Sequence, residues 1–395
     1  MFNLLDGFDG SPEASLALRD SLDQHVRTVG QTRGRGNRSL VGLAEAEVRT
    51  SPSACIHFDP TGLATVRTSS GEWTAGRFEM PSVGELRARA HAARALARPE
   101  STRLRLWVLD GVSPATDIGA LQAVAPPNSL FQVASQFNCL ESPGPYIAEI
   151  ADYFHDPTQG PRASISTFPG TLVRHYAAPH VDGSRFVQRS EGPQLDLLAA
   201  VCPPGVAAVK SGYLRSADVS DPEAFALELE SRFDQIRIGV HDEIEVVLGY
   251  DWDGGVDESR TSTIAQVFTS TLALGLYSRA GGDDELSIPI CRQLQRAAYL
   301  GTLLAAAALG KARVVLTLIG GGVFGNPVPI IWETILWAAD DVEPLLHRDL
   351  TVVVNGRNLR HAVPSATLSE TARARGGAMI RFNGESCTII PKRSV

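Results

Sequence analysis

The sequence predicts an α/β protein of three layers, in which a mixed, mostly parallel sheet lies between helices on its two faces. Strand-like runs recur between longer helical segments, and several of them are almost continuously apolar. Such runs are typical of strands covered on both faces. The predicted strands cover residues 104–110, 130–135, 236–250, 264–274, 312–319 and 350–355. Segments with helical spacing, 289–309 and 329–342, separate the last three strands.

The first hundred residues form an N-terminal extension, so we divide the chain into an extension, 1–100, and an α/β domain, 101–395. Residues 1–50 are polar apart from one helix-like stretch at 15–29. Alternating apolar and polar residues between turn signals predict a β-meander over 54–78, followed by a helix with Ser82 as its N-cap. The meander and helix are either a small appended domain or the opening elements of the main one.

Composition limits the classes of partner. The chain has 395 residues, 44% of them hydrophobic, and a formal charge of -8 with the charges interspersed. This charge argues against a nucleic-acid groove or an anionic membrane surface as the main partner. A small molecule that carries phosphate is still allowed, because backbone amides bind phosphate without adding net charge.

The five cysteines are scattered, odd in number and without a CxxC pair, which favours a reduced, cytoplasmic setting and argues against a zinc site. The N-terminus has acidic residues where a secretory signal has basic ones. The longest apolar run, 297–310, is too short to span a bilayer. We therefore expect a soluble protein with no membrane or metal partner and no cofactor.

The stretch LTLIGGGVFGNP, residues 316–327, places three glycines directly behind an apolar strand and before a helix. Bare amides at a strand end and beside a helix N-terminus can bind a diphosphate. The alternative is a tight strand-to-helix connection that packs closely. The loop is neither a Walker A sequence nor a G-x-G-x-x-G fingerprint.

Three other loops carry polar groups that could contact a ligand. Gln136, Phe137 and Asn138 follow the strand 130–135, at an edge where open α/β sheets bind ligands. The segment 153–176 has no regular period, which predicts a long ordered loop, and it holds Asp156, Thr158, Gln159 and Gly160. The strand 264–274 carries Gln266, and acids such as Asp251 and Asp253 precede it.

The order of these motifs resembles the macrodomain family over residues 104–355. FQVASQFNCLE, TQGP, QVF and LTLIGGGVFGNP look like the divergent members akin to poly(ADP-ribose) glycohydrolases, in particular the MavL-like group. The resemblance implies a macrodomain-like sheet and removal of ADP-ribose from a modified protein, with ubiquitin as one candidate target. Two features depart from the family: paired glutamates do not follow the glycine triplet, and the usual NAAN turn is SQFN.

Carried over to this sequence, the resemblance assigns contacts to the ligand. It implies that the loop around Gly321 wraps the diphosphate and distal ribose, that Asn138, with Gln136 nearby, contacts the distal ribose, and that Asp110 accepts from the adenine amino group. The implied ligand-binding set is Asp110, Gln136, Phe137, Asn138, Thr158, Gln159, Gly160, Gln266, Gly320, Gly321, Gly322, Val323, Phe324, Gly325 and Asn326.

Hydrolysis of an ADP-ribosyl bond needs a carboxyl group near the anomeric carbon. The available acids are Glu141, Asp156, and Asp251 or Asp253, and we prefer Asp156 with Asp253 because Glu141 could cap a following helix. Two other functions stay open: a reader module that binds ADP-ribose without cleaving it, and an NAD-linked oxidoreductase. A purely structural module ranks last.

Overall fold

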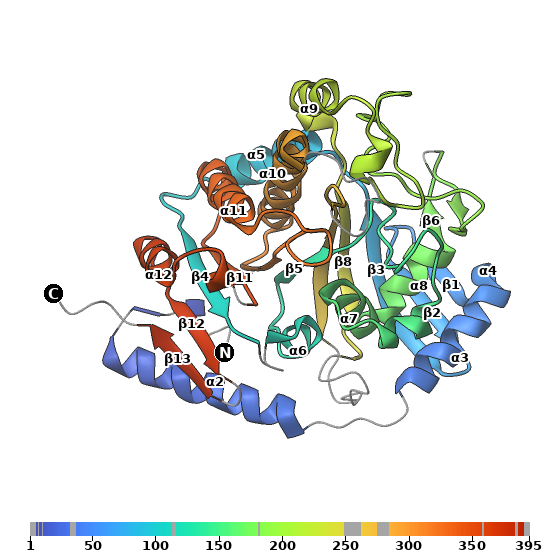
Figure 1. Cartoon of the computed structure of the whole chain (residues 1–395). Helices are drawn as coiled ribbons and strands as arrows, with labels where there is room; N and C mark the ends of the chain where they lie inside the picture. Colours follow the sequence, from blue (N-terminus) through green and yellow to red (C-terminus); the bar gives the residue numbers. More distant parts are fainter. Residues whose placement is uncertain are drawn as a thin grey trace.

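The structure is a computed structural model that describes residues 5–6, 8–9, 11–31, 37–112, 116–180, 182–248, 262–274, 284–357, 359–383 and 386–390. One sheet organises the molecule, in the order β1-β2-β3-β8-β9-β5-β10-β11-β4-β12-β13 (Figure 1). Its strands are β1 (Ile56–Phe58), β2 (Ala64–Thr68), β3 (Gly71–Glu79), β4 (Leu104–Asp110), β5 (Ser129–Ala134), β8 (Gly239–Glu245), β9 (Thr263–Thr269), β10 (Arg313–Thr317), β11 (Leu350–Asn355), β12 (Met379–Asn383) and β13 (Ser386–Ile390). A separate hairpin consists of β6 (Ala178–Pro179) and β7 (Arg185–Phe186).

The helices cover both faces of the sheet, which confirms the α/β class. They are α2 (Pro12–Gln31), α3 (Asn37–Thr50), α4 (Pro52–Cys55), α5 (Val83–Ala97), α6 (Ile118–Ala123), α7 (Gln159–Ser166), α8 (Phe168–Tyr176), α9 (Pro222–Ser231), α10 (Asp284–Leu309), α11 (Val328–Val342) and α12 (Ser365–Ala374). Helices α5, α10 and α11 pack together on one face, and α6, α7 and α8 lie on the other (Figure 1). No described helix is long and apolar enough to cross a membrane.

The centre of the sheet is parallel and its two edges are antiparallel. Strands β9, β5, β10, β11, β4 and β12 pair in parallel, whereas β1, β2, β3 and β8 continue the sheet beyond β9 in antiparallel fashion. The expectation of a mostly parallel sheet therefore holds only for the centre. Because β3 pairs with β8, the sheet runs without a break from the first hundred residues into the rest of the chain.

Local sequence signals explain several boundaries. Ser82 forms a capping box with Glu85 at the start of α5, as its side chain accepts from the Glu85 amide and the Glu85 carboxylate accepts from the Ser82 amide. Pro327 is the N-cap of α11, and Pro329 lies in its first turn, where a missing N–H costs nothing. The apolar run 350–355 is fully buried as β11.

The segment 153–176 differs from the irregular loop that the sequence predicts, because it contains α7 and α8. Every residue of α8 is buried, so the helix has no polar face that a periodic pattern could reveal. Its proline, Pro169, lies in the first turn, where proline does not interrupt a helix. The two helices position the polar residues of this segment on the sheet.

Candidate functional site

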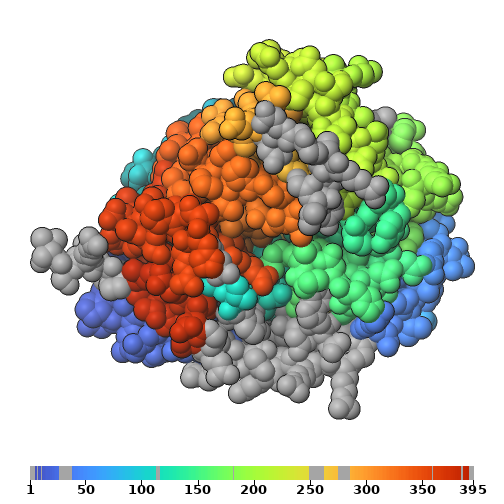
Figure 2. Space-filling view, viewed as in Figure 1, coloured from blue at the N-terminus to red at the C-terminus, as the bar shows by residue number. Residues whose placement is uncertain are grey.

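A cavity of about 370 Å³ lies at the carboxyl ends of β5, β10 and β11, the edge at which such sheets bind ligands. Its walls are the turn after β5, the segment that opens α7 and the glycine loop after β10. In the space-filling view, the orange segment with the glycine loop faces the green segment that leads to α7 (Figure 2). The predicted site residues that line the cavity are Gln136, Glu141, Asp156, Thr158, Gln159, Gly160, Gly320, Gly321, Gly322, Val323 and Phe324.

The three successive glycines serve different purposes. Gly320 has a φ of 76°, and an added Cβ there would lie 2.8 Å from Cγ of Asn326. A Cβ at Gly321 would lie 3.0 Å from Cδ1 of Ile331 on α11. A Cβ at Gly322 would meet no atom of the described part of the chain within 4 Å. Close packing therefore accounts for the first two glycines, and Gly322 is the one whose small size leaves room in the cavity.

The glycine loop also contains backbone amides that are not used by hydrogen bonds within the described residues. The N–H of Gly321 donates to the Leu318 carbonyl at 3.0 Å, so it is used within the loop. Within the described residues, the N–H groups of Gly320, Gly322 and Val323 donate no hydrogen bond. Free amides in a tight turn form a concave site for an anion. The loop is thus suited to a phosphate group.

Asn326 closes the glycine loop from inside the protein and does not line the cavity. Its Oδ1 accepts from Oγ1 of Thr271 at 2.9 Å and from Nε2 of Gln295 at 3.1 Å. Its Nδ2 donates to the Leu272 carbonyl at 2.8 Å. The side chain is therefore a staple between the loop, α10 and the segment after β9.

We expect Asn326→Ala to lower the free energy of unfolding by about 3 kcal/mol, because it leaves several buried polar groups unpaired. Thermal unfolding of the variant beside wild type measures this effect. The exposed Asn383, at the end of β12, provides a control as Asn383→Ala. Equal melting temperatures for all three proteins would contradict the structural role.

Glu141 places a buried carboxyl group in the cavity wall. The residue is 7% exposed, and its Oε1 has no hydrogen-bond partner within the described residues. Burial raises the pKa of this carboxyl well above its usual value; nearby Arg174 opposes the shift and Asp156 adds to it. The side chain lies against Gly160, where any Cβ would collide with Oε2. A carboxyl group whose pKa is raised by burial is suited to act as a general acid.

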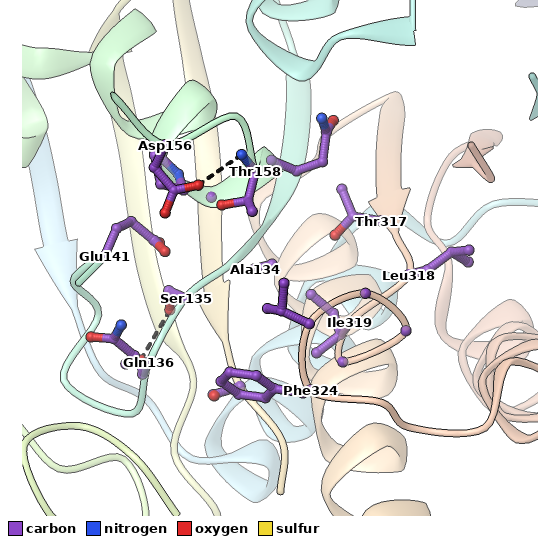
Figure 3. A pocket seen from close by; sticks show the side chains of 18 of the residues that line it. Ala134, Ser135, Gln136, Glu141, Asp156, Thr158, Thr317, Leu318, Ile319 and Phe324 are labelled. Atoms are coloured by element: carbon purple, nitrogen blue, oxygen red, sulfur yellow. Dashed lines mark hydrogen bonds between the residues drawn. The ribbon is translucent and has the colours of Figure 1, made fainter. Parts of the chain in front are cut away.

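Asp156 supplies a second carboxyl group to the same cavity. Its Oδ1 accepts from the Thr158 amide at 2.9 Å, and the side chain is half-buried. Figure 3 shows Asp156 and Glu141 on one side of the cavity, with Thr317 across from them. Two carboxyl groups in different surroundings can divide the roles of acid and base.

Gln136 and Phe324 shape the wall next to Glu141 (Figure 3). Nε2 of Gln136 donates to the Ser142 carbonyl at 2.6 Å and to the hydroxyl of Tyr213 at 2.9 Å. Its Oε1 is buried without a partner in the described part of the chain. The ring of Phe324 lies 5.9 Å from that of Tyr213. Gln136 is therefore fixed in place, and Phe324 offers an apolar surface to a ligand.

Three residues that line the cavity carry buried polar atoms without a hydrogen-bond partner in the described chain. Oγ1 of Thr317, Nε2 of Gln159 and Oδ1 of Asn355 are all buried without a hydrogen bond among the described residues. Buried polar groups are normally paired with protein, water or ligand. Gln159 thus offers a donor, Asn355 an acceptor and Thr317 a hydroxyl group to a polar ligand.

Arg357 is the only basic side chain among the described residues that line the cavity. If a diphosphate binds here, we expect Arg357→Gln to raise its Kd about tenfold, or about 1.4 kcal/mol, because one ionic contact is lost. Calorimetric titration with ADP-ribose at low and high salt measures this. The variant should also show a weaker salt dependence than wild type. Unchanged affinity would place the phosphates away from this side chain.

Three other residues that were predicted to contact the ligand do not line the cavity. Phe137 is buried in the apolar core. Nδ2 of Asn138 donates to Gln194 at 2.9 Å, and its Oδ1 accepts from the Leu140 amide at 3.1 Å. Gln266 bridges Thr167 and the Ala163 carbonyl. These three side chains hold the turn after β5 and helix α7, and they do not line the cavity.

Asp110, Gly325 and Asp253 also fall outside the cavity lining. Asp110 is fully buried, and its carboxylate lies 3.4 Å from Arg360 and 3.7 Å from Arg381. Gly325 has a φ of 69°, which explains the glycine by the turn alone. Asp253 lies outside the described residues.

Several lining residues were not predicted from the sequence: Ser135, Ser142, Tyr213, Thr317, Asn355 and Arg357. Two of these had a usable signal. Thr317 ends β10, and Asn355 ends β11, so each polar residue closes an apolar strand at the edge where ligands bind. Tyr213 lies in irregular chain far from any motif, and no local pattern marks it. Among the described residues, no group of three or more His, Cys, Asp and Glu is placed to hold a metal ion.

No protein-family model and no curated protein matches the sequence. Among solved structures, poly(ADP-ribose) glycohydrolase from Deinococcus radiodurans in apo form is similar at 13% identity and a TM-score of 0.40, over 75% of this chain and 93% of that one. The enzyme of the same name from Thermomonospora curvata is similar at 17% identity and a TM-score of 0.39, over 86% and 98%. A structure of the latter with the inhibitor ADP-HPD gives 16% and 0.39, over 86% and 99%. At these TM-scores the likeness does not by itself assign a fold or an activity.

Proposed function

We propose that this chain is an ADP-ribosyl hydrolase that releases ADP-ribose from a modified protein by cleavage at the anomeric carbon of the distal ribose. One observation carries the proposal: Glu141, a buried carboxyl group without a partner in the described chain, lies in the same cavity as the glycine loop. In this proposal the loop binds the diphosphate, and the carboxyl group is the general acid that assists cleavage of the bond. The resemblance of the GGGVFGN motif to the glycine loop of macrodomains supports the same function.

In this proposal the substrate is held from two directions. The amides of Gly320, Gly322 and Val323 bind the diphosphate, and Arg357 neutralises part of its charge. Figure 3 shows the ring of Phe324 on the cavity wall with Gln136 and Glu141. In our proposal this ring packs against the distal ribose and directs its anomeric carbon toward Glu141. Such contacts hold the sugar and its leaving group in a reactive position.

The two carboxyl groups then act in turn. As the bond to the leaving group breaks, the sugar acquires oxocarbenium character, and Glu141 gives its proton to the departing atom. Asp156, oriented by the Thr158 amide, accepts a hydrogen bond from the attacking water and takes up its proton. The products are free ADP-ribose and the unmodified side chain.

The first test is titration of the protein with ADP-ribose, with ADP and NAD as comparisons, followed by incubation with ADP-ribosylated protein, ADP-ribosylated ubiquitin included. We expect micromolar binding, about -8 kcal/mol, that is selective for ADP-ribose, and release of ADP-ribose over time. Binding without release would instead indicate a reader module. Preference for NAD together with a redox absorbance change would indicate an oxidoreductase, and no binding at all would overturn the proposal.

We also propose a cytoplasmic setting for this activity. All five cysteines are free thiols, and four of them are buried. Free thiols in this number are typical of proteins in a reducing compartment.

A further inference from the structure

Behind the cavity wall, the hydroxyl group of Tyr153 connects Glu141 to a histidine. The backbone N–H of Glu141 donates to this hydroxyl at 3.0 Å. The same hydroxyl lies 2.9 Å from Nε2 of His175. Tyr153 and His175 are each only 2% exposed. They come from different elements, the 3-10 turn Ile150–His155 and helix α8, so the contact joins three separate segments.

The direction of the two hydrogen bonds follows from their donors. The amide of Glu141 can only donate, so the Tyr153 hydroxyl accepts from it. We assign the hydroxyl proton to Nε2 of His175, because the other tautomer of the ring would leave that proton without an acceptor among the described residues. His175 therefore carries its proton on Nδ1. Burial, together with the nearby Arg174 cation, lowers the pKa of His175 to about 3, which keeps the ring neutral and able to accept.

Two charged side chains, Arg174 and Asp156, act electrostatically on Glu141. Arg174 is fully buried, and its Nε donates to the Cys139 carbonyl at 3.1 Å, two residues before Glu141. Asp156 is the other acid that acts on Glu141. Arg174 thus fixes the start of the short segment 139–141, and Tyr153 fixes its end.

We propose that Tyr153 and His175 are positioning residues, which hold the backbone of Glu141 so that its carboxyl group stays buried in the cavity. The inference rests on the proposed function of Glu141 and goes beyond it, because neither side chain lines that cavity. Without the Tyr153 hydroxyl, the amide of Glu141 loses its acceptor in a buried place. The segment then shifts, and the carboxyl group gains water.

Tyr176, next to His175 on helix α8, offers a matched control for Tyr153. It is also buried, and its hydroxyl donates to Oε1 of Glu45 at 2.9 Å, away from Glu141. Tyr153→Phe and Tyr176→Phe therefore remove the same atom from two buried tyrosines. A general packing effect would appear in both variants, whereas a positioning effect would appear only in the first.

The test measures kcat, KM and the pH dependence of kcat/KM for both variants on an ADP-ribosylated protein. We expect Tyr153→Phe to lower kcat by about 10- to 100-fold with little change in KM, because a small displacement of a catalytic group has effects of this size. A better hydrated Glu141 has a lower pKa, so the loss of activity at high pH should begin at a lower pH than in wild type. Tyr176→Phe should leave kcat, KM and the pH profile as in wild type.

Two substitutions of His175 test the same contact without changing Tyr153. In His175→Gln, the amide oxygen can still accept from the Tyr153 hydroxyl, whereas His175→Leu removes the acceptor. The glutamine variant should retain more kcat than the leucine variant. If Tyr153→Phe behaves like Tyr176→Phe, or if the two His175 variants are equal in kcat, the positioning role is overturned. Full activity of Glu141→Gln would instead overturn the proposed function itself.

Discussion

Replacing Glu141 with glutamine should lower kcat by about 10³-fold while leaving the affinity for ADP-ribose nearly unchanged. Glutamine has nearly the same shape as glutamate but no acidic proton, so the substitution removes the general acid and keeps the shape of the cavity. The side chain is buried with Oε1 unpaired among the described residues, and therefore no ion pair should be lost. Kinetics with ADP-ribosylated protein and calorimetry with ADP-ribose measure the two effects separately.

The control for this prediction is Asp152→Asn, which neutralises an exposed acid of the neighbouring 3-10 turn outside the cavity lining. Its kcat should match that of wild type. Asp156→Asn should lower kcat as well, because the attacking water loses its base. If Glu141→Gln stays fully active while Asp156→Asn is inactive, the acid role assigned to Glu141 is wrong.

The pH dependence has a defined sign. A general acid works only while protonated, so activity should fall as the pH rises through the pKa of Glu141. Because burial raises this pKa, activity should persist well above the usual glutamate value of about 4.3. Asp156 contributes to the upward shift, so the residual activity of Asp156→Asn should be lost at a lower pH than that of wild type. If the high-pH limb of the Asp156→Asn profile coincides with that of wild type, Asp156 does not influence the pKa of Glu141.

The sequence predicted the edge of the sheet at which the cavity lies because this edge depends on chain order and on apolar runs. The strands over 104–110 and 350–355 agree with the structure residue by residue. The glycine loop and Asp156 both line the cavity. The loop was predicted from glycines at a strand end, and Asp156 from a segment without a regular period.

Side-chain direction is what the sequence could not supply. Asn138 had the expected type and place, yet its amide is used to hold the turn through Leu140 and Gln194. Glu141 ranked below Asp156 because a helix cap seemed a sufficient explanation, but no helix begins there and the residue is buried. Burial and pairing depend on segments distant in the chain, such as Tyr153 and Gly160.

A second large effect is expected at the glycine loop, where Gly322→Glu should abolish detectable binding of ADP-ribose. The position is exposed, its φ is not in the left-handed region, and a Cβ there meets no atom of the described residues within 4 Å, so the variant should fold normally. The new carboxylate would lie where we place the diphosphate, and like charges in such a position cost several kcal/mol. Calorimetry, together with a melting curve for each protein, measures both parts.

Three further variants at this position separate charge from size. Gly322→Ala should bind as wild type, since its methyl group has no close neighbour. Gly322→Gln has the size of the glutamate variant without its charge and should bind more tightly than that variant, whereas Gly322→Lys should tolerate the diphosphate best. Binding of ADP-ribose by Gly322→Glu at wild-type strength would mean that no phosphate contacts this loop. The glycine triplet would then be explained by the positive φ and close contacts at Gly320 and by the tight contact with Ile331 at Gly321.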